Sequence, residues 1–129
     1  LCGNFILPEP ASYVFFYAFS NLRNLLYIIP ASRPVIAAKR DNMDEYDTIF
    51  VGFPIWWYIA PTIINTFLES YNLKGKTVIT FATSGGSGMG KTNEKLTPSC
   101  PGAKLLHGKV FNSYSSKADF SAWVETISL

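Results

Sequence analysis

The clearest indication of the fold is the segment Thr48-Ile49-Phe50-Val51-Gly52-Phe53, which is almost wholly apolar and stops at Pro54. A β-rich apolar run of this length, preceded by the charged residues of 41–47 and ended by a proline, is typical of a strand buried on both faces of a sheet. After it, Pro61 suits the first position of a helix, and apolar residues recur along one face through Asn72 to Gly75. We therefore predict a central strand followed by an amphipathic helix that covers the sheet.

The same alternation repeats toward the C-terminus. Residues 77–82 predict a second strand, followed by the glycine-rich loop 84–90 and a short helix that starts near Thr92 and ends before Pro98 or Pro101. Residues 104–110 predict a third strand, which Gly108 weakens, and residues 117–129 have the apolar spacing of a closing helix. Strands alternating with helices over short loops predict an α/β fold, a doubly wound parallel sheet with helices on both faces.

The N-terminal third gives a less regular pattern. Residues 13–19 and 25–29 both have the composition of strands, but the five residues between them are too few for a parallel crossover. Either the two segments pair as a hairpin or one of them is not a strand. Residues 1–32 are therefore the atypical part of the chain.

Length and composition exclude several classes of protein. The 129 residues suit a single domain, 1–129, and 48% hydrophobic residues exclude a disordered tail. A net charge of +2 is too small for binding to nucleic acid through its backbone. The apolar run Tyr13–Phe19 is too short to span a membrane, and no Lys or Arg precedes it as in a signal peptide. Because the sequence begins with Leu1, whether a further piece precedes it stays open.

The cysteines point to a reducing compartment. Cys2 and Cys100 lie near opposite ends of the sequence, and neither is part of a CxxC motif. The sequence therefore indicates neither a disulfide framework nor a zinc site. We therefore expect a cytoplasmic protein.

Two loops follow the predicted strands at the edge where ligands bind in open parallel sheets. The first contains Pro54, Ile55, Trp56, Trp57 and Tyr58. Three consecutive large rings cannot all turn inward, so at least one is expected on the surface. Two interpretations remain open: Trp56 and Trp57 cap the core, or they form a stacking wall for a flat aromatic ligand.

The second loop contains Thr83, Ser84, Gly85, Gly86, Ser87 and Gly88. Its glycines allow close approach of the backbone to a ligand, and its hydroxyl groups add donors and acceptors. The alternative is a flexible connection. Residues 85–92 also match the phosphate loop G-x-x-x-x-G-K-[ST], which raises a nucleoside triphosphatase as a further alternative. No later strand ends in the aspartate that would complete its magnesium site.

Other catalytic machinery is sparse. His107 lies within a predicted strand, and Cys100 lacks basic neighbours, so both are expected to be catalytically inert. The acidic residues Asp41, Asp44, Glu45 and Asp47 are expected to be a solvated approach to the strand. A chain without an evident nucleophile, base or metal ligands, but with a ring-stacking loop beside an amide-rich loop, favours a bound organic cofactor.

From about Arg33 onward, residues 46–57, the helix 60–71 and residues 81–88 together resemble the bacterial flavodoxin-like flavoprotein family, in particular its branch of short flavoproteins. The resemblance implies a three-layer α/β/α sandwich with strand order 2-1-3-4-5 and flavin mononucleotide (FMN) at its edge. It implies that residues 54–58 flank the isoalloxazine ring and that residues 83–88 bind its polar edge. The glycine-rich loop would then face the ring and not a triphosphate.

The resemblance implies electron transfer or small-molecule redox chemistry, with an FMN-dependent oxidoreductase as one form of it. The family places a glycine- and Ser/Thr-rich phosphate loop after its first strand, whereas residues 20–24 contain no glycine or threonine, and the first helix has no counterpart. The alternative is therefore a flavodoxin-fold module that has lost flavin binding and serves in interaction. The sequence leaves open whether the redox partner is a protein or a small flat acceptor, and whether the chain forms a homodimer.

Overall fold

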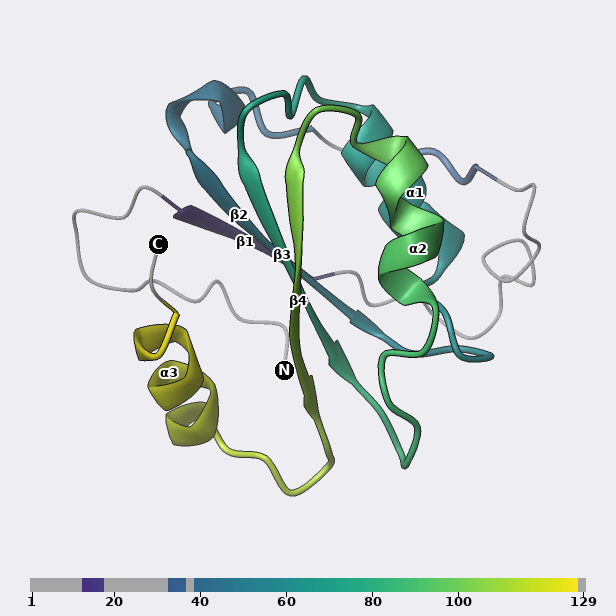
Figure 1. Cartoon of the computed structure of the whole chain (residues 1–129), viewed down its shortest axis with the longest axis vertical. Coiled ribbons are helices and arrows are strands. Elements are labelled where there is room, and N and C mark those ends of the chain that lie inside the picture. The colour runs from purple at the N-terminus through teal and green to yellow at the C-terminus, as the bar shows by residue number, and fades with distance from the viewer. Residues whose placement is uncertain (1–12, 18–32, 37–38, 128–129) are drawn as a thin grey trace.

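Four parallel strands form the sheet of the computed structural model, which describes residues 13–17, 33–36 and 39–127. The strands lie in chain order (Figure 1) and are β1 (Tyr13–Tyr17), β2 (Thr48–Pro54), β3 (Thr77–Thr83) and β4 (Lys104–Phe111). The strands predicted at 48–53, 77–82 and 104–110 are thus confirmed, and each of the three extends one residue further. The parallel sheet confirms the predicted α/β class.

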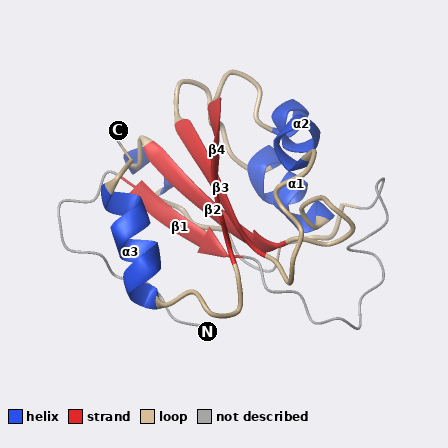
Figure 2. Cartoon of the chain, turned by 60° about the horizontal axis from the view of Figure 1, so that its bottom comes forward, coloured by secondary structure: helices blue, strands red, loops and turns tan. Residues whose placement is uncertain are grey.

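Three helices cover the two faces of this sheet. Helices α1 (Thr62–Glu69) and α2 (Thr92–Leu96) lie on one face, and α3 (Lys117–Glu125) lies on the other (Figures 1 and 2). Two short 3-10 helices, η2 (Met43–Glu45) and η3 (Thr97–Ser99), precede β2 and follow α2. The predicted three-layer α/β/α arrangement is confirmed.

The N-terminal strand pairs with the central strand in parallel. Its register places Tyr13 beside Thr48 and Tyr17 beside Gly52. The strand expected over 13–19 is confirmed over 13–17, whereas residues 18 and 19 and the second predicted segment, 25–29, lie outside the described residues. The order β1-β2-β3-β4 corresponds to the 1-3-4-5 part of the predicted order 2-1-3-4-5.

Helix α1 is shorter than the apolar pattern predicted. Pro61 is its N-cap, with an extended ψ of 142°, and not its first helical residue. The helix ends at Glu69, where the Ser70 hydroxyl donates a hydrogen bond to the Thr66 carbonyl at 2.6 Å. The chain must then turn back to β3 through Gly75, whose φ is +80°. This return explains why the helix does not continue to residues 72–75.

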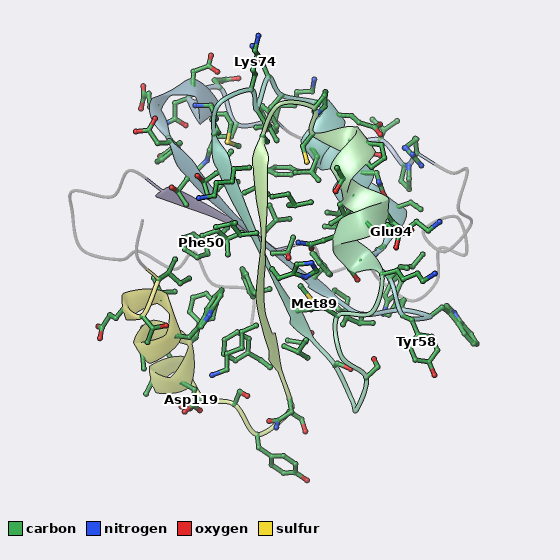
Figure 3. All side chains as sticks on the ribbon, viewed as in Figure 1. Phe50, Tyr58, Lys74, Met89, Glu94 and Asp119 are labelled. Carbon is green, nitrogen blue, oxygen red and sulfur yellow. The ribbon has the colours of Figure 1, made fainter. Side chains whose placement is uncertain are left out.

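Two hydrophobic clusters hold the layers together. The larger one lies under α1 and α2 and takes alternate residues of β2, which are Ile49, Val51 and Phe53. Phe50 faces the opposite side (Figure 3). There it belongs to the second cluster and packs edge-on against the ring of Trp123, which is part of α3. Every residue from Thr48 to Phe53 is buried, as predicted for a strand covered on both faces.

A bulge explains the weak strand signal at Gly108. Between the pairs Thr80–His107 and Ala82–Val110, β4 has one residue more than β3. A β-carbon at Gly108 would collide with the Thr80 carbonyl oxygen and approach the Trp123 ring to 3.0 Å. Glycine therefore belongs to this strand because the neighbouring backbone comes so close.

Candidate functional site

The aromatic loop and the glycine-rich loop leave the sheet side by side. Pro54 pairs with Thr83 at the carboxyl ends of β2 and β3. One residue further, the Ile55 amide donates a hydrogen bond to the Thr83 carbonyl at 2.9 Å. The structure thus brings together the two segments that the sequence singled out.

The aromatic loop contains a tight turn. Trp56 and Ile59 exchange two backbone hydrogen bonds of 3.0 and 3.1 Å, which leaves Trp57 and Tyr58 as the two central residues. Both have positive φ, 51° and 67°, as in a type I′ turn. Asn and Gly are usual at such positions, and a bulky residue there costs roughly 1–3 kcal/mol. Two aromatic residues in this conformation are a strained arrangement of the kind that gathers at functional sites.

The turn presents its central rings to solvent. Trp57 is 78% exposed and Tyr58 is 69% exposed, and Tyr58 extends away from the sheet (Figure 3). Pro54, Ile55 and Trp56 are half-buried, and Ile55 packs against the larger core cluster. The core-capping interpretation therefore applies to the start of the loop, whereas at least one ring lies on the surface as expected.

The glycine-rich loop is partly closed on itself. The Ser84 hydroxyl accepts hydrogen bonds from the amides of Gly86 at 3.2 Å and Ser87 at 2.9 Å, and it lies 2.8 Å from the Ser87 hydroxyl. These two amides are therefore engaged within the loop itself. The amides of Gly85 and Gly88 have no hydrogen-bond partner in the part of the chain that the structure describes.

Three glycines of this loop are not required by the protein's own packing. A β-carbon on Gly85, Gly86 or Gly88 would meet nothing within 4 Å, and none of the three has a left-handed φ. Gly85, Gly86 and Gly88 are exposed, as is Thr83, whereas Ser84 and Ser87 are half-buried. Glycine at these positions leaves bare backbone beside open space, which fits close approach by a flat ligand.

Sequence reasoning missed Gly90, which joins the two loops. It has a φ of +54°, and a β-carbon there would lie 2.7 Å from the Tyr58 carbonyl oxygen. In the sequence, Gly90 is only the last glycine of a glycine-rich stretch. Nothing in that stretch indicates that Gly90 lies against Tyr58.

The structure disfavours the phosphate-loop interpretation of residues 85–92. The Thr92 side chain is fully buried, and its hydroxyl has no hydrogen-bond partner among the described residues. In a phosphate loop this hydroxyl would face a magnesium ion. The helix that follows, α2, has only five residues.

The remaining titratable residues that the structure describes form no second site. His107 is exposed, and so are the acidic residues Asp41, Asp44, Glu45 and Asp47, as predicted. Cys100 is buried, and burial raises the pKa of its thiol, which keeps it protonated and unreactive. Within residues 13–17, 33–36 and 39–127, no group of three or more His, Cys, Asp or Glu could hold a metal ion. No helix in the same part of the chain is long and apolar enough to cross a membrane.

Comparison with known proteins gives a family match and similar solved structures. The chain matches the family described as Flavodoxin over residues 26–127. A putative flavoprotein from Bacteroides eggerthii DSM 20697 is 42% identical with a TM-score of 0.67, over 78% of this chain and 63% of that chain. A putative flavoprotein from Bacteroides uniformis ATCC 8492 is 43% identical with a TM-score of 0.68, and the match covers 76% of this chain and 62% of that chain. None of the curated proteins compared matches the chain.

The chain spans less than two thirds of the length of both structural relatives. The family match nevertheless covers most of this chain, from residue 26 to residue 127. The parallel sheet, the helices on both faces and the two adjacent loops at its carboxyl edge agree with that match. The chain therefore belongs to the flavodoxin family.

Proposed function

We propose that the chain binds FMN at the carboxyl edge of β2 and β3 and takes part in electron transfer or small-molecule redox chemistry. The observation that carries this proposal is the contact between two loops of complementary chemistry. One presents exposed aromatic rings on a strained turn, and the other presents bare glycine backbone next to open space. Membership of the flavodoxin family and the flavoprotein names of the structural relatives support it.

The residues present fit a flavin ring. Trp57 and Tyr58, with Trp56 at the base of the turn, would supply aromatic faces for stacking. The unpartnered amides of Gly85 and Gly88 would donate hydrogen bonds to the polar edge of the ring. When bound, FMN would supply the reversible uptake of electrons that protein side chains cannot provide.

The two loops would act through contact and not through proton transfer. Neither residues 54–59 nor residues 83–90 contain Asp, Glu, His, Lys or Arg. Their roles are therefore to hold the ring, to exclude water from its face and to set its electronic environment through stacking and amide dipoles.

The uncharged loops also favour a small flat acceptor over a protein partner steered by charge. Charge complementarity accelerates protein association only where charged groups border the contact. The overall charge of +2 is small as well. We also propose a cytoplasmic location, because the two cysteines of the sequence form neither a CxxC motif nor a disulfide framework.

A flavin titration tests the proposal. Purified protein is titrated with FMN and with riboflavin, and binding is followed by flavin fluorescence and by the absorption spectrum. We expect both ligands to bind, because the loops address the ring that they share. We expect Trp57→Ala or Tyr58→Ala to weaken binding by about 1–2 kcal/mol through the lost stacking contact.

Tyr114→Ala is the matched control. Tyr114 is 91% exposed but lies in the loop after β4, outside the two proposed loops. Its replacement should leave the dissociation constant for FMN unchanged. The proposal would be overturned by a colourless protein whose absorption spectrum and stability do not change when FMN or riboflavin is added. That result would favour the alternative of an interaction module.

A further inference from the structure

Gly90 lies where the end of the glycine-rich loop meets the aromatic turn. A β-carbon there would lie 2.7 Å from the carbonyl oxygen of Tyr58 and 3.5 Å from its β-carbon. Contacts between carbon and a carbonyl oxygen are ordinarily no shorter than about 3.3 Å. Only a residue without a side chain therefore fits between the two loops in this arrangement.

Tyr58 cannot retreat from this contact at low cost. Its carbonyl belongs to a turn that is closed on both sides by the hydrogen bonds between Trp56 and Ile59. Its backbone is already in the left-handed region, with a φ of 67°. Moving the carbonyl away would break these hydrogen bonds or change the conformation that turns the rings outward.

We propose that Gly90 is a positioning residue of the flavin site, which holds the Trp57–Tyr58 turn in place through the close approach of its backbone to the Tyr58 carbonyl. This inference rests on the proposed function for its effect on flavin. The position of the turn is a property of the protein alone and can be measured without the ligand.

Gly75 provides a matched control for the backbone conformation. It also has a left-handed φ, +80°, but a β-carbon on it would meet nothing within 4 Å. It lies in the turn before β3, at the opposite end of the sheet from the two loops. Alanine at Gly75 therefore imposes the strain of a left-handed residue without any contact to the aromatic turn.

The experiment compares Gly90→Ala with Gly75→Ala by two measurements. The first is the ¹H–¹⁵N spectrum of the flavin-free protein, in which Gly90→Ala should shift the amide signals of residues 56–59 and Gly75→Ala should not. The second is the dissociation constant for FMN, which Gly90→Ala should raise about tenfold, whereas Gly75→Ala should change it less than about twofold. A general loss of stability would affect both variants alike.

The two measurements separate the two proposals. Unshifted signals of residues 56–59 in Gly90→Ala, or an equal loss of FMN affinity in both variants, would overturn the positioning role. Shifted signals together with no FMN binding to the unchanged protein would support the geometry and overturn the proposed function, and with it the role of Gly90 in a flavin site. If Gly90→Ala does not fold, it is replaced by the double variant that carries both Tyr58→Gly and Gly90→Ala. Glycine at position 58 can change its backbone conformation and so move its carbonyl away from position 90.

In that background, the effect of Gly90→Ala is measured against Tyr58→Gly alone. If the double variant folds and its FMN affinity differs from that of Tyr58→Gly by less than about twofold, Gly90 acts through the Tyr58 backbone. A protein that still fails to fold would mean that position 90 is needed elsewhere, and it would overturn the proposal.

Discussion

Single residues in this protein show that the same amino acid can have unrelated roles. Gly108 is required because the Thr80 backbone lies against it, whereas a β-carbon on Gly85 would meet nothing within 4 Å. The first glycine serves the sheet, and the second leaves space beside the backbone. Only the surroundings of each residue distinguish the two.

Thr92 gives a prediction at the same scale. Its buried hydroxyl has no hydrogen-bond partner in the described part of the chain, so it carries a desolvation cost without compensation. We expect Thr92→Val to raise the free energy of unfolding by about 1 kcal/mol, measured by urea denaturation. FMN binding should not change, whereas a phosphate-loop protein would lose Mg-ATP binding.

Thr97→Val is the control for this prediction. The Thr97 hydroxyl donates a hydrogen bond to the Asn93 carbonyl at 2.8 Å, so its removal should destabilise the protein. A loss of stability in Thr92→Val of the same size would show that the Thr92 hydroxyl has a partner after all.

Among the elements, α3 depends on its N-terminus as well as on its packing. It has no fully buried residue, although Phe120 and Trp123 contact Phe81 at ring-centroid distances of 4.9 and 6.0 Å. At its start, Ser116 and Asp119 form a capping box, in which each side chain accepts a hydrogen bond from the backbone amide of the other residue. The cap satisfies amides that a helix of nine residues cannot satisfy itself.

The cap predicts a pH dependence. Hydrogen bonds from the backbone and then the side chain of Ser116, with a smaller effect of Lys109, hold the pKa of Asp119 below its ordinary value. A carboxylate with a lowered pKa in the folded state stabilises that state above the pKa of the unfolded chain, about 3.9. This stabilisation is lost as the pH falls through the lower folded-state pKa.

Urea denaturation at pH 7 and at about pH 3 measures this effect. The unchanged protein should lose more stability on acidification than Asp119→Ala does. Asp41→Ala removes an exposed carboxylate outside the cap and should keep the acid sensitivity of the unchanged protein. Equal acid sensitivity in all three proteins would contradict the role of the cap.

For the whole molecule, the two loops connect ligand binding to stability. They leave neighbouring strands and contact one another through Gly90 and Tyr58, so a ligand between them would bridge the segments that follow β2 and β3. A ligand that binds only the folded chain shifts the unfolding equilibrium by mass action.

We therefore expect FMN to raise the thermal unfolding midpoint. At a free concentration of about 100 times the dissociation constant, the gain in folding free energy is about 2.7 kcal/mol. Riboflavin at the same ratio to its own dissociation constant should give the same gain, whereas at equal concentrations any larger effect of FMN measures contacts to its phosphate. ATP with magnesium is the control and should leave the midpoint unchanged.

The strands β2, β3 and β4 and the loops between them could be predicted from the amino-acid pattern alone. Continuous apolar runs such as Thr48–Phe53 can be buried only within a covered sheet, and prolines and glycines interrupt the pattern where the chain must turn. Because parallel strands end at one edge, the sequence also indicated that residues 54–58 and 83–88 belong to the same region of the molecule.

How these loops meet became visible only in the folded chain. The left-handed backbone of Trp57 and Tyr58 and the approach of Gly90 to Tyr58 have no distinctive local pattern. Each depends on where the neighbouring strand or loop lies, since backbone strain and close contacts are fixed by packing between segments far apart in the sequence. Local periodicity records which residues are buried, but it does not record which backbone each residue touches.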